Sequence, residues 1–195
     1  LNWMILELSS YQIEGSPRIK PNIGIWTTFT PDHLERHHDI DTYFKIKCSL
    51  LNKSSIRIYN SDDKYLSNKR KELPKGIWVG TNQQSYYSHS PKFWIDQKGY
   101  IFEDQKKLFH TSILKMPGEH NLKNLLLVTA AAREIGLDHL SIANSITSFK
   151  AIPHRLEYLG KIDKLDFYND SKATNFESSL IGLKSVPSPT ILLAG

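Results

Sequence analysis

Short apolar runs alternate with helix-like patterns along the chain. Runs of about four to eight apolar or alternating residues, bounded by turn-forming residues, are typical of strands. They predict strands in the N-terminal third at 3–8, 22–28 and 55–60. A helix is expected between the last two, starting at the capping residues Asp41 and Thr42 and ending at Leu51. Apolar side chains recur along it with the spacing of a core-facing stripe, at Tyr43, Ile46 and Leu50.

The remainder of the chain continues this alternation. Two β-type runs, 92–96 and 99–103, are joined by a short turn and predict a hairpin. Two helices are expected next, the first closed by a glycine suited to the C-cap, over 121–135 and 140–149. Further strands are expected at 156–159, 166–168 and 191–194. Strands that alternate with helices predict an α/β fold with an antiparallel hairpin insert.

A break in the pattern at Pro153 predicts a domain boundary. A helical pattern ends before this proline and a strand pattern restarts after it, so the expected domains are 1–151 and 152–195. Strand-like runs also stand near both ends of the chain, whereas domains usually begin and end at exposed surface. We therefore expect a fragment of a longer protein.

Composition and charge narrow the class of protein. Hydrophobic residues make up 39% and charged residues 23%, as in an ordinary globular protein. The single cysteine, Cys48, excludes an internal disulfide framework, and no apolar run approaches the ~20 residues that span a bilayer. We therefore expect a reducing, cytoplasmic setting and no membrane insertion. The net charge of +5 favours anionic partners, although no zinc-finger or RNA-recognition signature accompanies the basic residues.

Three residues in the N-terminal third are candidates for chemistry. Glu7 lies inside an apolar run, where a carboxylate needs a partner or a metal unless the strand end is exposed. His33 follows Asp32, and the pair would suit a metal ligand with its orienting carboxylate or a simple capped turn. Lys47 flanks the apolar stripe of its helix, so it either reaches solvent or is partly buried with a lowered pKa.

The C-terminal half adds polar candidates. Asn121 stands at a helix start, where it would cap the helix or reach an anion. Arg155 offers a bidentate donor for phosphate and Lys172 a compact charge, in stretches that also suit plain loops. Neither a G-x-x-x-x-G-K-[ST] loop nor a G-x-G-x-x-G loop is present. The residues alone therefore indicate several polar sites but no complete catalytic centre.

Taken together, five segments resemble the Mur ligase family, in the form of its D-glutamate-adding members. They occur in the family's order and cover nearly the whole chain: LELSSYQIE at 6–14, DHLER at 32–36, YFKIK at 43–47, GEHNLKN at 118–124, and PHRLE at 153–157 with NDSKATN at 169–175. Sister ligases and folylpolyglutamate synthases share these segments only in outline.

The resemblance implies a fold and an activity. Residues 1–151 would be a central ATP-binding domain with a mostly parallel sheet flanked by helices, and 152–195 the start of a Rossmann-like C-terminal domain. Members of the family use ATP and Mg²⁺ to form an acyl phosphate, which an amine then attacks. The implied partners are the small molecules UDP-MurNAc-L-Ala and D-glutamate, which are joined in peptidoglycan synthesis. The implied enzyme is a monomer. Because the family's phosphate loop is missing, we expect the 195-residue chain alone to be inactive.

The resemblance also assigns roles to residues. Three would hold the magnesium ion, with the lysine carbamylated: Glu7, His33 and Lys47. Two would line the muramoyl-substrate side: Ser9 and Gln12. Four would contact the adenine nucleotide: Asn121, Asn124, Arg155 and Asp170. Lys172 would face the phosphates and Thr174 the D-glutamate, so the catalytic set comprises Lys47, His33 and Lys172.

Two alternative functions remain at this point. One is another amide ligase of the Mur or folylpolyglutamate type with a different amino acid. The other is a basic α/β domain that binds a nucleotide or RNA, which predicts a salt-dependent affinity for RNA.

Overall fold

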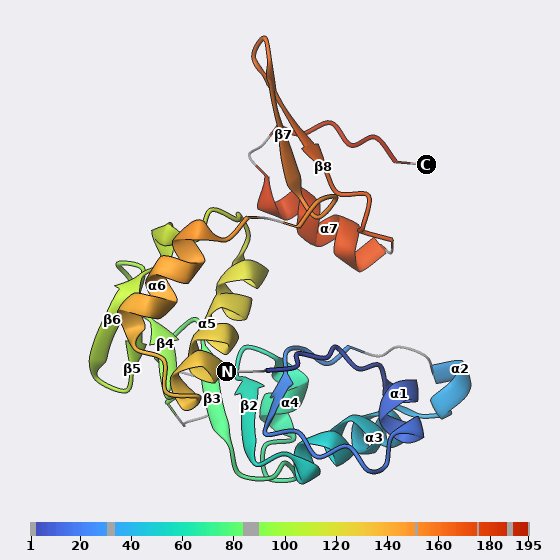
Figure 1. Ribbon diagram of the computed structural model, residues 1–195. Coiled ribbons are helices and arrows are strands. Elements are labelled where there is room, and N and C mark those ends of the chain that lie inside the picture. The colour runs from blue at the N-terminus through green and yellow to red at the C-terminus, as the bar shows by residue number, and fades with distance from the viewer. Residues whose placement is uncertain are drawn as a thin grey trace.

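A six-stranded sheet organises the larger part of the protein (Figure 1). The computed structural model describes residues 3–30, 34–83, 90–150, 152–174, 176–186 and 189–194. The strands lie in the sheet in their order along the chain: β1 Ile23–Trp26, β2 Ile56–Asn60, β3 Ile77–Gly80, β4 Phe93–Ile95, β5 Tyr100–Glu103 and β6 Lys106–His110. Neighbours from β1 to β4 are parallel, and those from β4 to β6 are antiparallel. The predicted α/β class with a mostly parallel sheet is confirmed.

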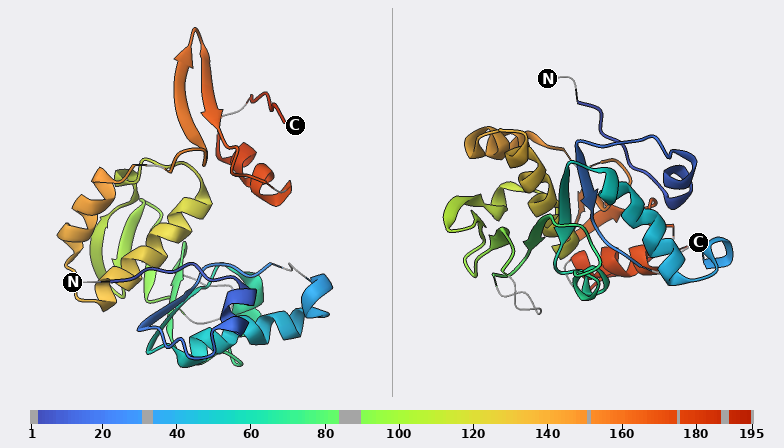
Figure 2. Two further views of the ribbon diagram at one scale, coloured as in Figure 1. Left: turned by 45° about the vertical axis from the view of Figure 1, so that its right-hand side comes forward. Right: turned by 90° about the horizontal axis from the view of Figure 1, so that it is seen from below.

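Helices cover both faces of this sheet (Figure 2). On the larger part of the protein they are α1 Ser10–Gly15, α2 Leu34–His37, α3 Ile40–Lys53, α4 Lys64–Asn68, η1 Thr111–Ile113, α5 Glu119–Glu134 and α6 His139–Ser148. Successive strand residues point to opposite faces, so Ile58 and Val79 join the core under α5 and α6. Tyr59 and Trp78, each next in sequence to one of them, join an aromatic core under α3 and α4.

Most predicted elements are present in the structure. The predicted strands at 22–28 and 55–60 contain β1 and β2, and the predicted hairpin is the β4–β5 pair. This hairpin is a continuation of the main sheet and not a separate insert. The two predicted helices at 121–135 and 140–149 are α5 and α6, shifted by one or two residues. Short elements that the hydrophobic pattern does not predict are α1, α2, α4, β3 and β6.

Two predicted strands are wrong. Residues 3–8 and 190–194 have no regular structure, and the apolar side chains Ile5 and Leu193 are 94% and 90% exposed. A strand needs a neighbour for its backbone hydrogen bonds and a layer over its apolar side chains. Neither run has such a neighbour among the described residues. Hydrophobicity alone therefore does not make these runs strands.

The start and the buried face of α3 also differ from the prediction. Asp39 is the N-cap, and its carboxylate accepts a hydrogen bond from Thr42 N at 2.7 Å. The fully buried side chains of α3 are Tyr43, Phe44, Cys48 and Leu51, whereas Ile46 and Leu50 are half-buried. The buried face is set by the aromatic cluster that α3 packs against, which includes Trp26 and Phe29.

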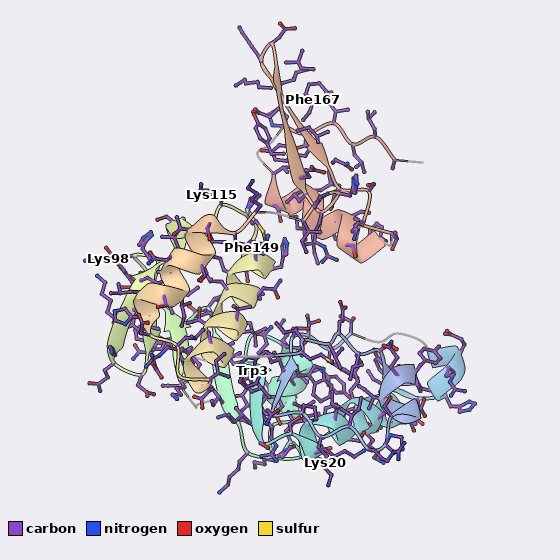
Figure 3. The ribbon with its side chains drawn as sticks, in the orientation of Figure 1. Trp3, Lys20, Lys98, Lys115, Phe149 and Phe167 are labelled. Carbon is purple, nitrogen blue, oxygen red and sulfur yellow. The ribbon has the colours of Figure 1, made fainter. Side chains whose placement is uncertain are left out.

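The C-terminal segment forms its own small unit (Figure 1). The antiparallel hairpin of β7 Glu157–Ile162 and β8 Leu165–Asn169 is followed by α7 Phe176–Ser185. The strands predicted at 156–159 and 166–168 are confirmed. Figure 3 shows Phe167 on the hairpin, with Lys115 and Phe149 beside the junction to the larger part. Residue 151, at the predicted domain boundary, lies outside the described residues.

Candidate active site

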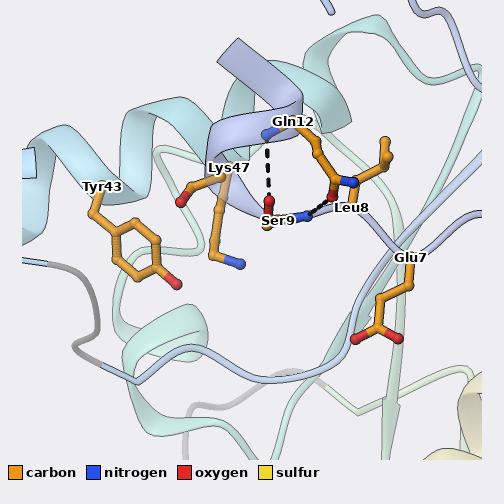
Figure 4. Close-up of a pocket in the computed structure, with 7 residues that line it drawn as sticks. Glu7, Leu8, Ser9, Gln12, Tyr43 and Lys47 are labelled. Carbon is orange, nitrogen blue, oxygen red and sulfur yellow. Dashed lines mark hydrogen bonds between the residues drawn. The ribbon is translucent and has the colours of Figure 1, made fainter. Parts of the chain in front are cut away.

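A cavity of about 380 Å³ lies between the N-terminus of α1 and the side of α3 (Figure 4). Its lining residues come from two segments: Glu7, Leu8, Ser9, Ser10, Gln12, Tyr43 and Lys47. Four of the sequence-predicted site residues therefore meet here, namely Glu7, Ser9, Gln12 and Lys47. The structure brings together the predicted metal side and the predicted muramoyl side of one site.

A capping box builds the wall formed by α1. Ser9 Oγ accepts a hydrogen bond from Gln12 N at 3.3 Å, and Gln12 Oε1 accepts one from Ser9 N at 2.8 Å. This reciprocal pair satisfies two backbone donors at the helix start. Ile13 is buried and anchors the short helix. Ser9 and Gln12 themselves remain exposed, so their polar atoms face the cavity with fixed backbone positions.

Lys47 provides the opposite wall, together with Tyr43 one turn earlier on α3. Its Nζ atom lies 5.1 Å from the centroid of the Tyr43 ring, within the range of a cation–π contact. Figure 4 shows the lysine side chain reaching into the space between Tyr43 and Ser9. Lys47 is half-buried, between the two positions that the sequence left open.

Glu7 enters the cavity from an exposed segment. The alternative of a buried, paired carboxylate inside a strand is wrong, because Glu7 is exposed and residues 3–8 are not a strand. Its carboxylate is nevertheless among the groups that line the cavity. Asp32 and His33 lie outside the described residues. Within the described ranges, no three His, Cys, Asp or Glu side chains converge as a metal site.

The donor set of the cavity fits a magnesium ion that shares its ligands with phosphates. Mg²⁺ is usually bound through one or two carboxylates together with substrate phosphates and several waters. Glu7 supplies one carboxylate to the cavity. The Lys47 amine lines the cavity from α3, and a carbamate on it would be a second oxygen ligand.

Sequence reasoning missed one buried residue behind this cavity. His37, at the end of α2, is 3% exposed, and its Nε2 atom is hydrogen bonded to Ser10 Oγ at 2.9 Å. Its ring also stacks on Tyr43, with centroids 5.2 Å apart. The sequence offered only a run of polar residues at 35–39, in which no periodicity marks one histidine as buried.

A second cavity, of about 610 Å³, lies between the larger part and the C-terminal unit. It is lined by residues from the start of α5, the end of α6 and the β7–β8 hairpin: Leu114, Lys115, Met116, Pro117, His120, Asn121, Phe149, Ile152, Arg155, Leu156, Tyr158, Asp166 and Tyr168. Asn121 and Arg155, both predicted nucleotide contacts, meet here. Asn124 is exposed on α5, and neither it nor Asp170 is among the lining residues.

The side chain of Asn121 is already engaged in a hydrogen bond to the backbone at this cavity. Its Nδ2 atom donates to Pro117 O at 2.6 Å, so it holds the turn before α5 rather than capping the helix, whose N-cap is Gly118. His120 was not singled out from the sequence. Burial lowers the pKa of its imidazole, Asp170 opposes the shift, and Arg155 lowers the pKa further. The neutral ring thus presents a polar edge without a charge to the cavity.

Gly118 allows the two parts to approach closely. Its φ of +102° is unfavourable for any side chain, and a Cβ atom there would lie 2.6 Å from Ser185 Oγ at the end of α7. The turn before α5 therefore touches the C-terminal unit directly.

The loop at 169–174 holds the remaining candidates. Asp170 is half-buried, and its Oδ1 atom accepts a hydrogen bond from Leu156 N at 2.8 Å. Lys172 donates its backbone N–H to His154 O at 3.0 Å, and its side chain is exposed. Thr174 is exposed as well. Lys172 and Thr174 line neither of the two cavities, so the structure does not bring them to Glu7 and Lys47.

Comparison with known protein families shows to which family the chain belongs. Residues 1–132 match the Mur ligase middle domain. The chain belongs to the Mur ligase family. The resemblance seen in the sequence motifs is thereby confirmed. This Mur ligase chain contains no helix, among the described residues, that is both long and apolar enough to cross a membrane.

Curated relatives carry a more specific name. The Mur ligase chain is 77% identical over 195 residues to UDP-N-acetylmuramoylalanine--D-glutamate ligase of Prochlorococcus marinus, covering all of this chain and 42% of that protein. It is 47% identical over 194 residues to the protein of the same name from Parasynechococcus marenigrum, with the same coverage of 42%. The chain thus spans less than half the length of these relatives.

Solved structures share the fold of the Mur ligase chain. A pseudomurein peptide ligase type C from Methanothermus fervidus aligns with a TM-score of 0.70 at 14% identity, over 93% of this chain and 44% of that one. MurF from Acinetobacter baumannii aligns with a TM-score of 0.68 at 16% identity, over 90% of this chain and 40% of that one. At such identities the likeness concerns the fold alone.

Proposed function

We propose that the whole protein is an ATP-dependent ligase that joins D-glutamate to UDP-N-acetylmuramoyl-L-alanine. The supporting observation is the 77% identity, over the entire chain, to a relative with that name. The other relative named above and the match to the Mur ligase middle domain agree with it. The anionic substrates also suit the net charge of +5. In this proposal the enzyme is a cytoplasmic monomer, and 152–195 begins a separate domain.

The first cavity would hold the reacting ends of the substrates. The substrate carboxylate takes the γ-phosphoryl group of ATP to form an acyl phosphate, and ADP leaves. The amine of D-glutamate then attacks the acyl carbon, a tetrahedral intermediate forms, and phosphate is expelled as the amide bond closes. Ser9 and Gln12 would orient the muramoyl substrate from α1, where the capping box holds their backbone. Such positioning accounts for much of the catalysis in phosphoryl transfer.

Magnesium would be held on the Glu7 and Lys47 side of this cavity, with His33 as a further ligand. When bound, the ion would offset the negative charge that gathers on the transferred phosphoryl group. Lys47 would act as a carbamate, because an ammonium group has no lone pair to offer a cation. Its half-buried place beside Tyr43 would keep that group aimed into the cavity.

The second cavity would receive the adenosine part of ATP. Its lining mixes apolar and aromatic side chains with a few polar groups, which is the usual character of a small-molecule site. Asn121 and Arg155 would contact the nucleotide, with Asn124 three residues further along α5 and Asp170 in the loop after β8, where it accepts from Leu156 N. Lys172 would face the phosphates and Thr174 the D-glutamate from the C-terminal unit.

Phosphate release tests this function. The whole protein, incubated with UDP-MurNAc-L-Ala, D-glutamate and Mg-ATP, should release phosphate only when all three are present, and the 195-residue chain should release none. A panel of other amino acids in place of D-glutamate separates this activity from that of a sister ligase. Equal turnover with another amino acid, or salt-dependent RNA binding without any turnover, would refute the proposal.

A further inference from the structure

His37 lies behind the first cavity, between the wall formed by α1 and the wall formed by α3. Its side chain is 3% exposed and contributes nothing to the cavity lining. Its Nε2 atom is hydrogen bonded to Ser10 Oγ at 2.9 Å, and Ser10 is 1% exposed. Ser10 stands between the two predicted substrate contacts of α1, Ser9 and Gln12. This bond therefore ties α1 to the segment that ends at His37.

The same imidazole ring supports the opposite wall. It stacks on the Tyr43 ring at a centroid distance of 5.2 Å and an interplanar angle of 22°. The Tyr43 ring in turn has Lys47 Nζ at 5.1 Å from its centroid. One side chain thus contacts both the α1 wall, through Ser10, and the α3 wall, through Tyr43.

A tight turn fixes the backbone that carries this ring. Asp39 N donates to His37 O at 2.8 Å, and His38 between them has a φ of +64°. Asp39 then caps α3 by accepting from Thr42 N. The ring of His37 is therefore attached to the start of α3 by two residues of ordered turn, which leaves it little freedom to follow a displaced α1.

We propose that His37 is a positioning residue, which sets the distance between the Ser9–Gln12 wall and the Tyr43–Lys47 wall for the muramoyl substrate. The proposal rests on the proposed function for the identity of that substrate. A histidine that only filled the core would need apolar contacts and no particular partner. His37 instead has a specific hydrogen-bond partner on one wall and a stacked ring on the other. Positioning by a residue that never touches the substrate requires such paired contacts.

Kinetics of variants in the whole ligase test the proposal. Ser10→Ala and His37→Phe remove the same hydrogen bond from opposite sides, and His37→Phe keeps an aromatic ring against Tyr43. Each should raise the KM for UDP-MurNAc-L-Ala about five- to tenfold, the scale of one net hydrogen bond. The KM for ATP should stay within about twofold, because Asn121 and Arg155 line a different cavity. The double variant should be no worse than either single variant.

Two further variants separate positioning from stability. His37→Gln keeps a hydrogen-bonding group for Ser10 but loses the ring against Tyr43, so its KM should lie between that of the wild type and that of His37→Phe. Ser54→Ala removes a buried hydroxyl that donates to Leu50 O at 2.8 Å, at the far end of α3. It should lower the Tm as Ser10→Ala does and leave the KM unchanged. A lowered Tm with an unchanged KM in Ser10→Ala and His37→Phe, or additive effects in the double variant, would overturn the proposal.

A measurement without turnover keeps this proposal apart from the proposed function. Acetic anhydride acylates lysine amines, and in buffer freed of CO₂, which keeps the Lys47 amine uncarbamylated, mass spectrometry gives the rate at Lys47. His37→Ala removes both the bond to Ser10 and the stack on Tyr43, so acylation of Lys47 should become about two- to fivefold faster as its aromatic contact loosens. An unchanged rate would overturn the positioning role even if the wild type proves to use another substrate. A wild type without turnover, but with the faster acylation in His37→Ala, would overturn only the function.

Discussion

Asp63 joins two parts of the fold that the sequence places far apart, and its removal gives a measurable prediction. One carboxylate oxygen accepts from Phe29 N at 2.6 Å, and the other accepts from Leu66 N at 2.9 Å as the N-cap of α4. The first bond holds the residues that follow β1. The second caps the start of α4, the helix that follows β2. Both donors belong to buried residues of the aromatic core.

The cost of Asp63→Ala can be estimated from these two bonds. Loss of the cap costs about 1 kcal/mol. The buried Phe29 N–H then lacks its charged acceptor, which adds about 1.5–3 kcal/mol. We therefore expect the free energy of unfolding to fall by about 3 kcal/mol, a large share of the ~5–15 kcal/mol typical of domains.

Asp138→Ala is the matched control for this prediction. Asp138 caps α6 by accepting from Leu140 N and Ser141 N, and its carboxylate accepts from no described residue outside this helix. Its loss should therefore cost clearly less than the loss of Asp63, because only a helix cap is removed. Urea unfolding of both variants, followed by tryptophan fluorescence, measures the difference. Equal losses in the two variants would refute the reasoning that Asp63 stabilises the exit of β1.

Gly118→Ala should lower the Tm by several degrees, because φ is +102° and the new Cβ would meet Ser185; a Tm equal to that of the wild type would contradict the close approach. Lys47→Ala should abolish turnover by the whole protein, with partial rescue by short carboxylic acids, and full activity would exclude the carbamate role. Hydrogen bonds from Ser141 lower the pKa of Asp138, so its contribution is present above the ordinary value of 3.8 and is lost as the pH falls below it. Acid unfolding curves of the wild type and Asp138→Ala should therefore converge below about pH 4, and a constant gap would contradict this.

Local patterns in the sequence determined the long helices, the β4–β5 hairpin and most of the sheet. α5 and α6 appear within two residues of their predicted bounds, because apolar spacing and a closing glycine act through neighbours a turn away. The β4–β5 pair follows from the short turn that joins adjacent runs, whereas for β7 and β8 the sequence predicted the strands but not their pairing. The candidate residues Glu7, Ser9, Gln12 and Lys47 were also chosen from the sequence, through motifs that resemble a known family.

Tertiary structure alone decided which of these residues meet and which runs are buried. Ile5 is as apolar as Ile58, yet one is 94% and the other 0% exposed, because burial depends on neighbours that are distant in sequence. The buried side of α3 follows from the aromatic cluster it meets. The role proposed for His37 could not be read from its neighbours in the sequence, since its partners Ser10 and Tyr43 are brought to it only when α1 and α3 pack around α2.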